Sequence, residues 1–170
     1  LAEIELRQGN VEESAELLMK VAKSSNGDLT KWRAVSELWL NAVQGDFARR
    51  SNRAIAAARS ATQGSSGRQR VEAELLLIET LLHANAFSDA EKALDAFAAL
   101  AERETKVIPL DIAQKARILR GHYLAQMGKA GETSALWQEL AGHVSPNSTR
   151  RSSQALREKV TEPSPALSTP

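Results

Sequence analysis

The sequence predicts an all-α protein made of paired antiparallel helices, and three observations support this prediction. The 170 residues include 28 Ala and 21 Leu, two of the strongest helix formers. The chain is poor in the β-branched and aromatic residues that a β-sandwich needs, with aromatic residues at 4 %. Four turn signals, at Gly9-Asn10, Gly45-Asp46, Asn85-Ala86 and Gly128-Lys129, lie 36, 40 and 43 residues apart, a spacing typical of helical-hairpin arrays.

Each expected helix is a run of apolar residues at helical spacing between these turns. Longer loops are expected at residues 24–28, 63–67 and 104–108. Pro109 suits the first turn of the helix that follows it, where its missing N–H costs nothing. The expected helices cover residues 1–8, 11–24, 29–43, 47–61, 67–84, 88–103, 109–127 and 131–143.

Local signals mark the ends of these helices. Gly or Asn at each turn suits a helix C-terminus that needs a left-handed residue. Asn10 is followed by Glu13, and Ser88 by Glu91, at the spacing in which the two side chains cap each other's backbone N–H groups. Asp46 is expected to cap the helix after Gly45.

The two ends of the chain differ from the middle. Residues 145–170 hold four of the five prolines and many Ser and Thr, so we expect a flexible tail over 144–170. Within it, a short helix over 149–161 is possible because Ala155, Leu156 and Val160 are nearly in phase. Since Leu1 lies in what reads as mid-helix, we expect the chain to be a piece of a longer protein.

Alignment on the four turns gives columns of apolar residues, which predict the core. The residues nine and twelve positions after each turn are apolar in every repeat, and Trp137 is therefore predicted to be buried. The residue seven positions before each turn is small or apolar, which favours close packing of paired helices. These columns are Leu18, Ala54, Leu94 and Trp137; Val21, Ala57, Phe97 and Leu140; and Ala2, Leu38, Ile78 and Gly121.

Two segments resemble a known family, first LAEIELRQGNVEESAELLMKVAK (Leu1–Lys23) and after it IETLLHANAFSDAEKALDAFAAL (Ile78–Leu100). The family is that of the tetratricopeptide repeats. The likeness covers about residues 1–143 and is to the longer, degenerate repeats of large bacterial regulatory and signalling proteins. It implies about three and a half hairpins, the first truncated, in a right-handed superhelix. The family's usual Ala early in the second helix is kept only at Ala90, and Glu37 and Arg120 replace large apolar residues.

The sequence predicts neither a catalytic site nor a metal or cofactor site. Without Cys there is no disulfide or Cys-based zinc site. His83, His122 and His143 lack the spacing of a helical metal site, and no phosphate-binding or nucleophile motif occurs. A net charge of +1 gives no field that attracts nucleic acid. No apolar run is long enough for a membrane span, and the cytoplasm is the expected compartment.

The resemblance implies that the first helix of each pair lines a concave groove that binds a partner. Trp32 and Trp39 would then lie two turns apart on one exposed face, and Trp39→Ala would weaken partner binding by about 2 kcal/mol without loss of helicity. The alternative is that both tryptophans pack against neighbouring helices. The expected partner contacts are Trp32, Val35, Trp39, Val43, Glu79, His83, His122 and Gln126.

The function predicted from these features is a non-enzymatic scaffold that binds a peptide or helix of a protein partner in this groove. One alternative is a ligand-sensing repeat region of a larger transcriptional or signalling regulator. Another is a structural spacer that self-associates through its repeats.

Overall fold

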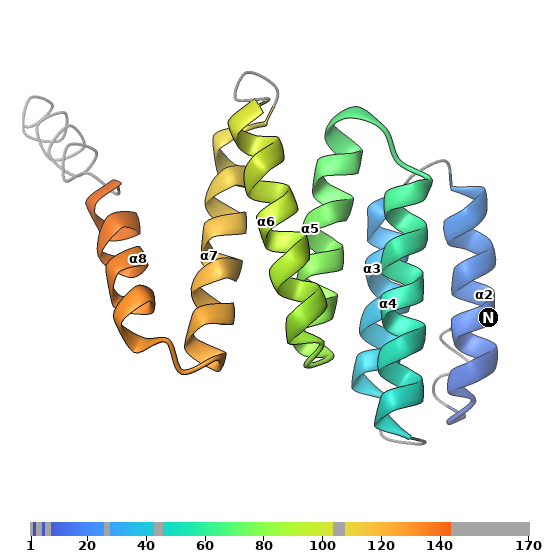
Figure 1. Ribbon diagram of the computed structural model, residues 1–170. Helices are drawn as coiled ribbons and strands as arrows, with labels where there is room; N and C mark the ends of the chain where they lie inside the picture. Colours follow the sequence, from blue (N-terminus) through green and yellow to red (C-terminus); the bar gives the residue numbers. More distant parts are fainter. Residues whose placement is uncertain are drawn as a thin grey trace, which may run out of the picture.

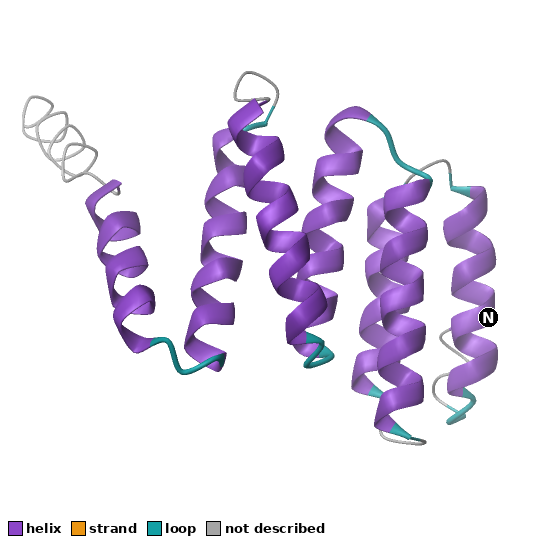
Figure 2. Ribbon diagram, in the orientation of Figure 1, coloured by secondary structure: helices purple, strands orange, loops and turns teal. Residues whose placement is uncertain are grey.

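The computed structural model describes residues 2, 5, 8–25, 28–42, 46–103 and 108–143. Within these residues the chain is all-helical, without strands (Figure 2). This confirms the prediction of an all-α fold. The helices are α2 (Val11–Ser24), α3 (Leu29–Asn41), α4 (Phe47–Gln63), α5 (Gly67–His83), α6 (Phe87–Arg103), α7 (Leu110–Gln126) and α8 (Ala130–His143).

The predicted helices over 11–143 are confirmed, and each end lies within two residues of its expected position. The predicted helix over 29–43 ends early, because Ala42 has extended backbone angles (φ −61°, ψ 129°). Of the predicted helix over 1–8, the described residues are Ala2, Glu5 and Gln8. The predicted tail over 144–170, including the helix over 149–161, lies outside the described residues.

The predicted turn chemistry is confirmed at four positions. Gly9, Asn85 and Gly128 all adopt positive φ angles, of 84°, 56° and 70°. This left-handed conformation reverses the chain after a helix, and residues without a bulky side chain adopt it at least cost. Asp46 caps α4, since its carboxylate accepts a hydrogen bond of 3.2 Å from the backbone N–H of Ala48.

Three predicted helix starts are wrong in detail. Asn10 precedes α2 without a side-chain cap, because its backbone angles (φ −82°, ψ 70°) are not those of a capping residue; its Nδ2 donates to the Glu5 carboxylate at 2.8 Å. Ser88 lies inside α6, which begins at Phe87, so it cannot cap that helix. Pro109 is the residue before α7 rather than a residue of its first turn.

The helices pack in chain order, each against the next (Figure 1). In addition, α3 contacts α5, and α5 contacts α7. The first helices of successive hairpins therefore form a row of their own. One buried cluster joins α2, α3, α4 and α5, and a second joins α4, α5, α6 and α7. Leu40 and Leu77 pack against both clusters, so the core is continuous along the stack.

Alanine brings α4 close to its neighbours. Ala54, Ala58 and Ala61 are completely buried, and Ala54 and Ala58 lie one helical turn apart. The Ser36 hydroxyl of α3 donates to the backbone carbonyl of Ala54 at 3.3 Å. Such a bond requires α3 to approach the α4 backbone, and a side chain of one carbon permits that approach.

The prediction of buried core columns is wrong at two residues, since Val21 is 46 % exposed and Trp137 is 38 % exposed. The indole lies against Gly121 of α7, where a Cβ atom would come within 2.8 Å of Cζ2. It also meets the His122 ring edge-on, with centroids 5.9 Å apart. One face of the Trp137 indole therefore packs against α7. α8 is the last described helix, and no described helix follows it to cover the other face.

Candidate functional site

The structure buries the residues of α3 that were expected to contact a partner. Trp32 is 5 % exposed, Val35 0 % and Trp39 4 %, and all three belong to the core cluster shared with α2, α4 and α5. The expectation of an exposed aromatic face on α3 is therefore wrong, and the alternative, packing against neighbouring helices, holds. Val43 lies outside the described residues.

The length of the turns explains this error. Residues 84–86 separate α5 from α6, and residues 127–129 separate α7 from α8, whereas the longer stretch 42–46 separates α3 from α4. The turn after α3 thus has two additional residues. Alignment on the turn Gly45 consequently shifts α3 by two positions, which is more than half a helical turn and selects its buried side.

Equivalent positions of α3, α5 and α7 are found instead by counting backward from the last residue of each helix. Asn41 then corresponds to His83 and Gln126, and Glu37 corresponds to Glu79 and His122. We call this set the α3/α5/α7 face, and all its members except Leu75 are at least partly exposed. Of the twelve, Glu79, His83, His122 and Gln126 were among the expected contacts, whereas none of the four on α3 was. The face comprises Thr30, Arg33, Glu37 and Asn41; Glu72, Leu75, Glu79 and His83; and Lys115, Ile118, His122 and Gln126.

A groove of about 310 Å³ lies where the first halves of α3, α5 and α7 meet. We call it the central groove. Its floor includes the buried side chains of Leu75, Leu76 and Ile112. Its rim carries a hydroxyl group and charges of both signs, from Thr30, Arg33, Glu72, Asp111 and Lys115.

Glu79 links the three helices of this face through two ion pairs. Its Oε2 lies 2.7 Å from Arg33 Nη1 on α3, and its Oε1 lies 2.8 Å from Lys115 Nζ on α7. The side chain of Glu79 is only 16 % exposed, while Arg33 and Lys115 are 39 % and 45 % exposed. One carboxylate therefore fixes the positions of two cations beside the central groove.

The electrostatics of Glu79 follow from this arrangement. Burial by itself would raise the pKa of the carboxyl group. The hydrogen bonds from Lys115 and Arg33, together with their positive charges, outweigh burial and lower the pKa below its ordinary 4.5. The ionised form is therefore the one that the folded state prefers.

The lowered pKa predicts how stability responds to acid. The contribution of Glu79 is fully present above about pH 4.5 and is lost as the pH falls through the lowered pKa. Glu79→Gln should destabilise the chain at pH 7, and the gap to the wild type should narrow below pH 4.5. Urea unfolding across this pH range measures both. Glu132→Gln, which alters an exposed pair with Lys129 at 4.0 Å, is the control and should leave the pH profile unchanged. A constant gap at all pH values would contradict the prediction.

The other expected contacts are distributed along the same face. His83 is exposed at the end of α5, and Gln126 is exposed at the end of α7. His122 is exposed and contacts Trp137. The structure therefore places these three residues and Glu79 on one face, but brings only Glu79 into direct contact with charged groups of both neighbouring helices.

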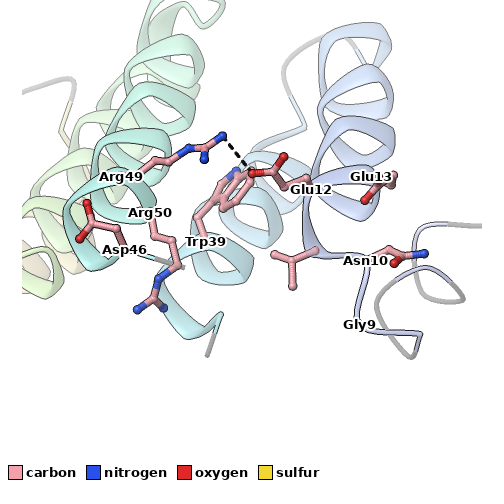
Figure 3. A pocket seen from close by; sticks show the side chains of 9 residues that line it. Gly9, Asn10, Glu12, Glu13, Trp39, Asp46, Arg49 and Arg50 are labelled. Carbon is pink, nitrogen blue, oxygen red and sulfur yellow. Dashed lines mark ion pairs between the residues drawn. The ribbon is translucent and has the colours of Figure 1, made fainter. Parts of the chain in front are cut away.

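A separate pocket of about 340 Å³ lies between the first turns of α2 and α4 and the end of α3 (Figure 3). One ion-pair cluster crosses between the two helices, since Glu12 Oε1 lies 3.2 Å from Arg49 Nη2 and 3.0 Å from Arg53 Nη1. The Arg53 guanidinium also covers the Trp39 ring, 4.5 Å from its centroid. These contacts hold α2, α3 and α4 together, so we assign this pocket a structural role.

The described residues contain no group of three His, Asp or Glu side chains that could hold a metal ion. None of the described helices combines the length and the apolar character needed to cross a membrane. Comparison with models of protein families, with curated proteins and with solved structures gives no significant match.

Proposed function

We propose that this chain is a non-enzymatic interaction scaffold, a stack of hairpins similar to tetratricopeptide repeats that binds a peptide or helix on its α3/α5/α7 face. Stacked hairpins leave the first helices of successive pairs side by side, as the contacts of α3 with α5 and of α5 with α7 do here. In this proposal the stack is a right-handed superhelix and the α3/α5/α7 face is its concave side.

The observation that supports binding most directly is the composition of the central groove. Buried apolar side chains form its floor, and a few polar groups converge at its rim, as in most sites that bind organic ligands. The rim carries two positive side chains, Arg33 and Lys115, and two negative ones, Glu72 and Asp111, so its net charge is zero. This favours a peptide held by apolar contact and hydrogen bonds over a strongly charged partner.

Selection from a displayed library of random dodecapeptides tests this proposal. The tightest peptide, synthesised and titrated by calorimetry, should bind Thr30→Trp at least about tenfold more weakly than the wild type, because the indole fills the groove. Ser88→Trp is the matched control, since Ser88 is also an exposed hydroxyl residue in the first turn of a helix. Equal affinity of both variants, or no selected peptide, would reject the proposal.

A second candidate function is a ligand-sensing region within a larger regulator. It is favoured by a larger and more apolar groove on another part of the stack, between α6 and α7.

A further inference from the structure

The groove between α6 and α7, called here the α6/α7 groove, has a volume of about 560 Å³. This falls within the usual range of small-molecule sites, about 300–1,000 Å³. Eight of the side chains that line it are apolar, including Phe97, Ile108 and Leu110. The other three are charged, namely Glu102, Arg117 and Arg120. The groove therefore combines a long apolar wall with a small charged region.

The apolar wall runs from the core to solvent. Phe97 is 4 % exposed and Ile108 9 %, so the floor belongs to the folded core. Leu110 is 74 % exposed, the most exposed large apolar side chain among the described residues. Exposed apolar surface beside a groove is unfavourable in water and is covered when an apolar ligand binds.

The charged region offers hydrogen-bond donors to an anion. Arg120 Nη1 lies 3.0 Å from Asp95, and Arg117 Nη1 lies 3.3 Å from Glu139, and neither carboxylate lines the groove. A guanidinium has five N–H donors, so each arginine can bond a ligand while it keeps its ion pair. Glu102, Asp95 and Glu139 together offset the charge of the two arginines, so it is the remaining N–H donors, and not an excess of positive charge, that a carboxylate would use here.

We propose that the α6/α7 groove binds a single-chain anionic amphiphile, such as a free fatty acid. The chain lies along the apolar wall from Phe97 to Leu110, and the carboxylate bonds to Arg117 and Arg120. A phospholipid, with two chains, is too large for this volume.

Calorimetric titration with dodecanoate, below its micelle concentration, tests this inference. Ala98→Trp places an indole in the groove, while Ala99→Trp places the same group at the adjacent exposed position, which does not line it. Dodecanoate should saturate one site in the wild type and in Ala99→Trp. Its affinity for Ala98→Trp should fall at least about tenfold. Circular dichroism establishes that both variants remain helical.

The role of charge has its own test. Dodecyltrimethylammonium has the same chain and the opposite charge, so it should bind at least about tenfold more weakly than dodecanoate. The double variant Arg117→Gln, Arg120→Gln should lose this preference. Phosphatidylglycerol vesicles should not compete with dodecanoate. The proposal is overturned by lack of saturable binding, by equal affinity for Ala98→Trp and Ala99→Trp, by equal affinity for the cation, or by competition from the vesicles.

Discussion

Replacing Trp39 by alanine is expected to lower the free energy of unfolding by about 3–5 kcal/mol. The indole is 4 % exposed in the cluster that joins α2, α3, α4 and α5, so the substitution leaves a cavity where four helices meet. It also removes the ring that lies under the Arg53 guanidinium. Urea unfolding followed by circular dichroism measures the loss. Should the alanine variant fail to fold, Trp39→Phe, which keeps an aromatic ring, should show a smaller loss of the same sign.

Trp137→Ala is the matched control for Trp39→Ala. Trp137 is 38 % exposed and lies on the last described helix, so its removal should cost only about 1 kcal/mol. If Trp39→Ala instead kept full stability and lost affinity for a peptide selected on the wild type, Trp39 would be a partner contact and its burial in the core would be refuted.

The sequence was sufficient to predict the fold class and the helix boundaries, because both depend on local signals. The spacing of apolar residues predicted where the helices lie. Gly9, Asn85 and Gly128 predicted the turns, and all three residues adopt positive φ angles. The capping box at Asn10 failed for a reason that spacing cannot reveal. The backbone of Asn10 lies outside the β region that a capping residue adopts, and its Nδ2 donates to Glu5; both depend on the path of the chain into α2.

The candidate site could be predicted only in part. On α5 and α7 the register was right, and Glu79 was included among the expected contacts. On α3 the register was wrong, because a turn signal gives the position of a turn and not its length. The partners of Glu79 could not be predicted from sequence either, since Arg33 and Lys115 belong to two other hairpins and reach it only through the stacking of α3, α5 and α7.

The close packing of α3 and α4 predicts the second large effect, in Ala58→Leu. Ala58 is completely buried, and the added carbons must displace a neighbouring helix or adopt strained rotamers, at a cost of about 1–3 kcal/mol. Ala56→Leu adds the same atoms at an exposed position of the same helix and should change stability by less than about 0.5 kcal/mol. Since Leu and Ala are both good helix formers, the difference between the two variants isolates packing from helix propensity. Urea unfolding of both variants measures this difference. Equal stabilities would mean that α4 tolerates a larger side chain against its neighbours, and the abundance of alanine in this helix would then need an explanation other than close packing.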